Sequence, residues 1–354
     1  MNGANAFDKF VETHQLAWRR EHIADQRQGT QNGKSRPWIL PAELWEEGLW
    51  PGIRSGSAHS LPAYLKTPGK EIEKHKGVHN LKSSWMLCAN LYFPFGGDKG
   101  LPILAGFLKA HVSPRIEAVE AVELEYEEAP LLDPQSLLGE PEGGTRGANQ
   151  TSPDVAFVVR TTVGTGLILT ENKLVEHSFY PCSGRKPAVR NPDIRRCLDW
   201  QKLQTNPPGQ CWQMQWEQGT RKNRKYWEHI RLSEHGRRVL TRCPAATGGY
   251  QLFRQQALAE GIAAKGQYDL VVSCVAYDSR NKALIHCLRD TGVDDFSAGW
   301  GALFDGQAQF ATFTHQQWVA WVRAHDQGGQ WRDWLSYVEA RYDYGEAVGW
   351  GTEP

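Results

Sequence analysis

The chain has 354 residues, and its 40 Lys and Arg residues balance its 40 Asp and Glu residues, so the formal net charge is zero. With 40% hydrophobic and 23% charged residues, the composition is that of a folded protein and excludes intrinsic disorder. No stretch approaches the roughly 18 consecutive apolar residues of a membrane-spanning helix, and zero net charge leaves only local patches as evidence for nucleic-acid binding.

The first predicted element is an amphipathic helix over residues 1–27, with Phe7, Phe10, Val11 and Trp18 near one face. It lacks the apolar core and small-residue cleavage site of a secretory signal. We therefore expect a cytoplasmic protein.

The next part of the chain mixes irregular and helical segments. An irregular stretch rich in Trp and Pro covers 38–65, and helices are expected over 76–95 and 100–112. Apolar and acidic residues alternate over 118–126, the period of a half-buried strand. Residues 133–152 are rich in Gly, Pro, Ser and Asn, which predicts a loop.

Two strand-like runs follow, over 154–162 and 166–176, with glycines between them that permit a hairpin turn. The chain then separates its charge. Residues 183–242 hold 14 Lys and Arg against 5 Asp and Glu, whereas 115–146 holds 9 acidic residues against 2 basic ones. The basic segment has little apolar periodicity, so we interpret it as an insertion.

The C-terminal third predicts further elements of an α/β fold. A helix is expected over 250–264 and a strand over 268–277, followed by a third strand-like piece over 282–289. Two more helices, 314–325 and 331–341, carry Trp at their apolar positions, which is typical of core packing.

The strongest chemical signal is Asp154 followed by Glu171, Asn172 and Lys173. With Asp154 at the start of one strand of the hairpin, its carboxylate and that of Glu171 can converge across the strand pair. Glu171 and Lys173 are two residues apart and leave the same face. Asn172 points away, but its backbone carbonyl can face a metal ion.

This set of groups suits phosphodiester hydrolysis. Mg²⁺ binds hard oxygen ligands and needs only one or two carboxylates beside water and phosphate. The ion acidifies a bound water, and a neighbouring lysine stabilises developing negative charge. Alone, the motif is short and frequent, and a solvated Asp with an ordinary strand-face Glu and Lys is the alternative.

The context of the motif strengthens this interpretation. Segments LKSSWMLCANLYFPF, ELEYEE, SPDVAFVV, ILTENKLVEHSF and YQLFRQQALAE occur in this order over roughly 38–310. Together they resemble the PD-(D/E)xK nuclease superfamily, and in particular restriction-endonuclease-like bacterial proteins. The resemblance implies that Asp154 and Glu171 bind the metal and that Lys173 is the catalytic lysine.

The resemblance also suggests supporting residues. An upstream acidic residue often completes the metal site in this superfamily, and Glu125 is the candidate here; an exposed strand residue is the alternative. The helix that contains Gln255 is similar to the helix after the catalytic strand in such nucleases, where a polar residue approaches the site. The long basic segment before this helix departs from the pattern.

Basic residues of the insertion are candidates for contacting DNA. Positive charge binds phosphates without reading sequence, and the neighbouring aromatic residues could stack on unpaired bases. A solvated surface loop is the alternative. The candidates are Arg185, Lys186, Arg221, Lys222, Arg224 and Lys225.

Seven cysteines occur without a CxxC pair, which favours reduced thiols over a disulfide framework. Some nucleases of the superfamily carry an iron–sulfur cluster held by four cysteines. Here the intervals between Cys182, Cys197, Cys211 and Cys243 are long and irregular, and histidines nearby are equally available to zinc. Buried free thiols are therefore the preferred interpretation.

We thus expect an α/β restriction-endonuclease-like core, with a mixed central sheet flanked by helices and helical extensions at both ends. The expected regions are 1–70, the core over 71–310 with its insertion 183–242, and 311–354. The expected activity is Mg²⁺-dependent hydrolysis of DNA, with Mn²⁺ as a substitute ion. An inactive nucleic-acid-binding module is the main alternative, and cutting both strands would suit a homodimer. We expect no membrane association, and the sequence lacks the motifs of other hydrolases.

Overall fold

A mixed five-stranded sheet forms the centre of the molecule, in the order β3-β4-β5-β6-β7. The computed structural model describes residues 3–68, 72, 77–127, 130–141, 150–185, 194–214 and 223–345. The first three strands are antiparallel, and β5, β6 and β7 are parallel. The strands are β3 (Ile116–Leu124), β4 (Val155–Thr161), β5 (Thr165–Lys173), β6 (Leu270–Tyr277) and β7 (Gln309–Thr314).

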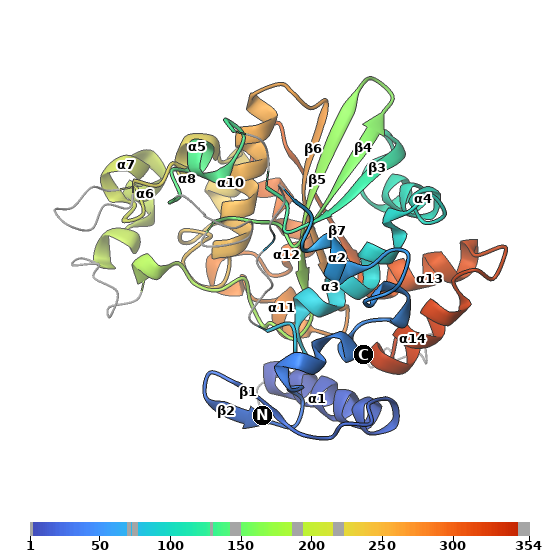
Figure 1. Cartoon of the computed structure of the whole chain (residues 1–354). Helices are drawn as coiled ribbons and strands as arrows, with labels where there is room; N and C mark the ends of the chain where they lie inside the picture. Colours follow the sequence, from blue (N-terminus) through green and yellow to red (C-terminus); the bar gives the residue numbers. More distant parts are fainter. Residues whose placement is uncertain are drawn as a thin grey trace, which may run out of the picture.

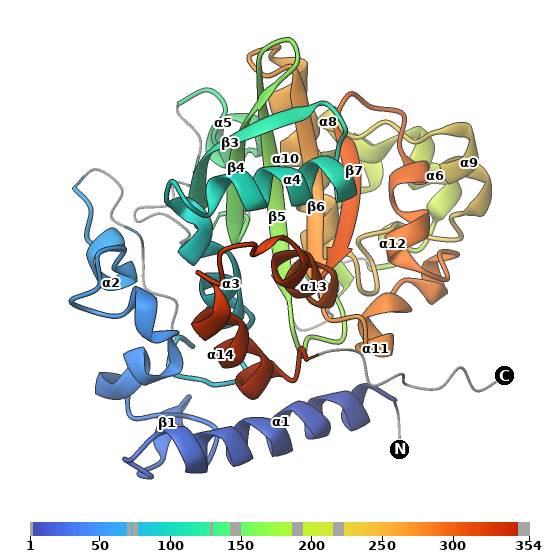
Figure 2. The same ribbon diagram turned by 90° about the vertical axis from the view of Figure 1, so that its right-hand side faces the viewer.

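Helices cover both faces of this sheet (Figures 1 and 2). One face carries α10 (Tyr250–Ala264), which packs on β5 and β6 and also contacts α5 (Pro134–Leu138) and α8 (Tyr226–His229). The other face carries α3 (Ser84–Tyr92), α4 (Leu101–His111) and α13 (His315–His325), and α14 (Arg332–Tyr342) packs on α13. The predicted mixed sheet flanked by helices is confirmed.

The remaining elements lie around these layers. The N-terminal helix α1 (Gly3–His22) packs on α14, and a small hairpin of β1 (Gly29–Gln31) and β2 (Lys34–Arg36) follows it. The short helices are α2 (Leu61–Tyr64), α6 (Trp200–Thr205), α7 (Pro207–Gln210), α9 (Glu234–Val239), α11 (Lys282–Ile285) and α12 (Phe296–Gly299). Among the described residues, no helix combines the length and apolar character needed to cross a membrane.

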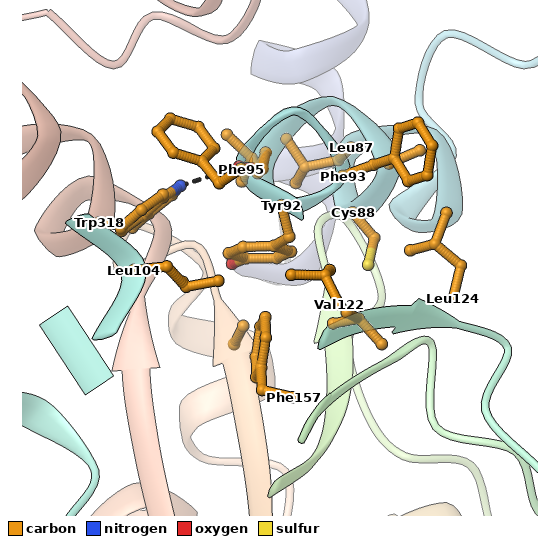
Figure 3. Close-up of a cluster of buried hydrophobic side chains, with 14 of the residues drawn as sticks. Leu87, Cys88, Tyr92, Phe93, Phe95, Leu104, Val122, Leu124, Phe157 and Trp318 are labelled. Atoms are coloured by element: carbon orange, nitrogen blue, oxygen red, sulfur yellow. Dashed lines mark hydrogen bonds between the residues drawn. The ribbon is translucent and has the colours of Figure 1, made fainter. Parts of the chain in front are cut away.

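Aromatic side chains fill the core between the sheet and α3, α4 and α13 (Figure 3). Tyr92 of α3 packs edge-on against Phe157 of β4, and Trp318 of α13 lies beside it. Trp318 is fully buried and donates its indole N–H to the carbonyl of Leu91 at 3.0 Å. Such a pairing satisfies the polar end of a large apolar side chain. The prediction that the C-terminal tryptophans belong to the core is therefore confirmed for Trp318 and Trp334.

Most predicted elements occur where expected, and α10 has the predicted bounds, but residues 282–289 are wrongly predicted as a strand. They begin with the short helix α11, because Asn281 accepts a hydrogen bond from the backbone N–H of Leu284 and so caps its first turn. The Asn281 amide also donates to the carbonyls of Leu174 and Glu176, which ties α11 to the end of β5. The strand in this part of the chain is β7, which comes later in the sequence. The predicted end of the core at residue 310 falls within this strand.

Candidate active site

The register of the β4–β5 hairpin brings Asp154 and Glu171 together. Val155 pairs with Thr170, so Asp154, one residue earlier, lies opposite Glu171 on the adjacent strand. Residues opposite one another in an antiparallel pair project to the same face of the sheet. The backbone N–H of Asn172 donates to Oδ2 of Asp154 at 2.7 Å, which fixes the carboxylate at the end of the hairpin.

Lys173 completes a buried charge pair on the face that α10 covers. Its Nζ donates to Oε1 of Glu171 at 2.6 Å and to Oε1 of Gln251, in the first turn of α10, at 3.0 Å. Glu171 is 8% exposed and Lys173 is 3% exposed. The two-residue spacing thus places both charges on one face, as the sequence predicts.

Asn172 projects to the opposite face and attaches α3 to the sheet. Its amide donates to the carbonyl of Ser84 at 2.7 Å. Because its backbone N–H points toward Asp154, its carbonyl points to the same edge of the strand. The two carboxylates of Asp154 and Glu171 and this carbonyl therefore lie at the same end of the hairpin.

Carboxylates dominate the electrostatics of this region. Burial raises the pKa of Asp154 well above its usual range, and the charges of Glu171 and Glu125 raise it further. Burial opposes the charged form of Lys173, but the carboxylates of Glu171, Glu176 and Asp154 outweigh this and raise its pKa. The lysine therefore remains protonated, whereas burial and the neighbouring carboxylates favour the neutral form of Asp154.

Glu125 lies just after β3, beside the first strand of the hairpin. Its backbone N–H donates to the carbonyl of Asp154 at 3.1 Å, and its φ of 47° is unusual for a residue other than glycine. Within the described ranges, no three His, Cys, Asp or Glu side chains form a group that could hold a metal ion. The role of Glu125 as an additional ligand stays a prediction.

Gln255 supports the fold beneath the site and not the charged groups themselves. Its amide donates to the carbonyls of Leu169 and Cys274 and so attaches α10 to β5 and β6. Its role as a supporting residue of the site stays a prediction. The glutamine that contacts Lys173 is Gln251, which the sequence analysis missed. The signal was its position four residues earlier, on the same face of the helix.

A buried histidine contacts the backbone at the end of β5. Nε2 of His315 lies 3.1 Å from the carbonyl of Lys173, and Nδ1 lies 3.1 Å from the hydroxyl of Tyr92. A carbonyl only accepts, so Nε2 carries the proton and the tyrosine donates to Nδ1. Burial lowers the pKa of His315 to about 4, so the ring is neutral at physiological pH.

The basic residues predicted to contact DNA fall into two groups. Arg224 donates to the carbonyl of Gly139, and Nζ of Lys225 donates to that of Ser136 at 3.4 Å, so both residues dock the insertion on α5. Arg185 lines a small internal cavity. Three candidates lie outside the described residues: Lys186, Arg221 and Lys222. Contact of any of the six with DNA stays a prediction.

Comparison with known proteins identifies a family. No curated protein and no solved structure matches the chain. A family model described as "Restriction Endonuclease associating with ARP" matches residues 12–343, which include the whole sheet and every candidate site residue. This match confirms the resemblance to restriction-endonuclease-like proteins of the PD-(D/E)xK superfamily. The chain therefore belongs to the family of restriction endonucleases associating with ARP.

Proposed function

We propose that this protein is a Mg²⁺-dependent endonuclease that hydrolyses DNA phosphodiester bonds with Asp154, Glu171 and Lys173. The observation that carries the proposal is the register that sets Asp154 opposite Glu171, with Lys173 hydrogen-bonded to the latter. A nucleic-acid-binding module without activity needs no acidic residues that face phosphate. The family description adds association with ARP, and we extend this partnership to the chain as part of the proposal.

The donor set fits a hard divalent cation. Asp154, Glu171 and the backbone carbonyl of Asn172 would hold Mg²⁺, or Mn²⁺ in its place, since such ions bind oxygen and retain several waters. Repulsion between Glu171 and Asp154 helps to raise the pKa of Asp154, and a cation relieves such repulsion. When bound, the ion supplies an acidified water and neutralises charge on the phosphate.

The protein groups position the reaction. The protonated Lys173 cannot act as a base, so its ammonium stabilises negative charge that develops on the phosphate oxygens. Gln251 and Glu171 hold this ammonium from two directions. The N–H of Asn172 orients the carboxylate of Asp154. If this carboxylate rotated or shifted, the site would lose the fixed geometry that brings the reacting groups together.

The test uses plasmid, linear duplex, single-stranded DNA and RNA, each with Mg²⁺, Mn²⁺ or EDTA. Asp154→Asn and Glu171→Gln should abolish cleavage of DNA, whereas Asp333→Asn, at an exposed position on α14, should cleave as the wild type does. All variants should still bind DNA. Cleavage by Asp154→Asn at the wild-type rate would refute the site, and binding without cleavage under every condition would favour the inactive module.

A further inference from the structure

Four of the seven cysteines meet at one internal cavity, although two lie within the basic insertion and the other two lie just outside its ends. Cys182, Cys197, Cys211 and Cys243 all line a cavity of about 20 Å³, together with aromatic side chains that include Trp212. The cavity lies between the insertion and the N-terminal part of α10. The intervals between these cysteines in the sequence are irregular, which favours unrelated free thiols, but the fold brings all four to one place.

Backbone N–H groups stabilise the charged form of three of these sulfurs. The N–H of Gly184 donates to the sulfur of Cys182 at 3.4 Å, and the backbone N–H groups two positions after Cys211 and Cys243 lower the pKa values of those thiols. The side-chain amide of Gln213 donates to the sulfur of Cys182 at 3.3 Å as well. Thiols that only fill space need no such donors, whereas thiolates bound to metal are stabilised by them.

Burial favours the protonated form of three of these thiols. Burial raises the pKa of Cys211 to about 12, and it also raises the pKa values of Cys182 and Cys243. The charge of a neighbouring cysteine of the group also raises the pKa of each of these three thiols. Protonated buried thiols are poor nucleophiles, but a soft metal displaces their protons on binding.

We propose that Cys182, Cys197, Cys211 and Cys243 hold an iron–sulfur cluster. In such a cluster the four sulfurs are distributed over two or four iron atoms around a central core, whereas zinc draws four sulfurs to about 2.3 Å from one ion. The sulfurs here surround a cavity, and the described residues contain no group of three side chains arranged for a single ion.

The size and charge of the surroundings fit this assignment. The cavity as it stands has room for about one water molecule. Metal–sulfur bonds of about 2.3 Å are much shorter than non-bonded contacts to sulfur. The metal core can therefore lie closer to the sulfurs than any unbound atom can, and it occupies space that the thiol surfaces now take. Arg185 lines the cavity and the charge of Arg254 acts on Cys182, so cations offset the negative charge of four thiolates.

The experiment measures metal on the full-length protein purified without oxygen. Iron and acid-labile sulfide should be present in near-equal amounts with broad visible absorption. Both should be lost in Cys211→Ser and Cys243→Ser. They should be retained in Cys287→Ser, a matched control at a half-buried cysteine outside the cavity. An X-ray absorption spectrum of the wild-type protein at the iron edge needs no variant, and it should show sulfur ligands with iron–iron scattering.

Three results would overturn the proposal: stoichiometric zinc without sulfide, iron with only oxygen or nitrogen ligands, or no bound metal with seven titratable thiols. Iron retained equally in Cys243→Ser would also overturn it. None of these readouts depends on nuclease activity, so the proposed function and the cluster can fail separately.

Discussion

Replacing Lys173 by Met tests whether the proposed catalytic lysine is also the counter-charge of a buried carboxylate. The substitution keeps an unbranched side chain of similar length but removes the ammonium 2.6 Å from Glu171. Glu171 is only 8% exposed, so its charge loses a partner that water cannot readily replace. Breaking a buried ion pair in this way costs about 3–5 kcal/mol, and the partial exposure of Glu171 favours the lower value.

This cost can be expressed as a melting temperature. An unfolding entropy of about 2.1 cal/mol/K per residue over 354 residues gives roughly 0.74 kcal/mol/K for one cooperative unit. A loss of about 3 kcal/mol therefore lowers Tm by about 4 °C. Combining Glu171→Gln with Lys173→Met removes the unpaired charge, so the double variant should melt at a higher temperature than Lys173→Met alone. Coupling between the two positions is what a double-mutant cycle measures.

Ca²⁺ should partly restore the Tm of Lys173→Met, since a divalent cation at Asp154 and Glu171 replaces the missing positive charge. We expect Ca²⁺ to raise the Tm of Lys173→Met by more than that of the wild type, while cleavage with Mg²⁺ is lost. Lys202→Met is the matched control, because Lys202 is 70% exposed in its pair with Asp199 and such surface pairs contribute about 1 kcal/mol or less. Equal melting of both lysine variants, with no difference in their response to Ca²⁺, would refute the reasoning.

Three further predictions concern the surroundings of the site. The pKa of His315 is about 4 in the folded protein and about 6.5 in the unfolded chain. The stability that comes from burying the neutral ring is therefore fully present above pH ~6.5, and about 3 kcal/mol of the free energy of unfolding is lost as the pH falls to ~4. Urea unfolding of His315→Gln should show a flatter dependence across this window than the wild type. Gln251→Ala should lower the cleavage rate about tenfold, the value of one hydrogen bond to a charged group, and an unchanged rate would remove it from the site. Replacing Arg224 and Lys225 by Ala should reduce the salt slope of DNA binding by about 2, and an unchanged slope would limit both residues to docking on α5.

The parts of the fold that could be predicted are those in which local sequence decides the structure. The apolar run before Glu171 and the glycines before it predict the β4–β5 hairpin, and period and register then bring Asp154, Glu171 and Lys173 to one face. Strand β7 was missed because it is a half-buried sheet edge whose pairing with β6 comes from tertiary contacts. Such contacts override local propensity.

The supporting residues of the site could not be predicted, because their roles depend on distant contacts. Gln251 reaches Lys173 from 78 positions along the chain, and His315 reaches the carbonyl of the same residue from 142 positions. Both are polar residues at the start of a helix, a common surface position. The cysteines show the same limit, since irregular spacing carries no information about a cavity that forms only when the insertion folds against α10.

The residues that follow β5 therefore fix the start of α10, and α10 in turn contacts Lys173 at the end of β5. The chain leaves the site at Lys173, and the carbonyls of Phe179 and Tyr180 then accept hydrogen bonds from the first two N–H groups of α10, those of Gln251 and Tyr250, each at 2.9 Å. These bonds fix the start of the helix that presents Gln251 to Lys173. Tyr250 also lines the cysteine cavity, so a change there moves the same helical turn. Any disturbance of the four cysteines should consequently reach catalysis through the position of Lys173, with DNA binding less affected.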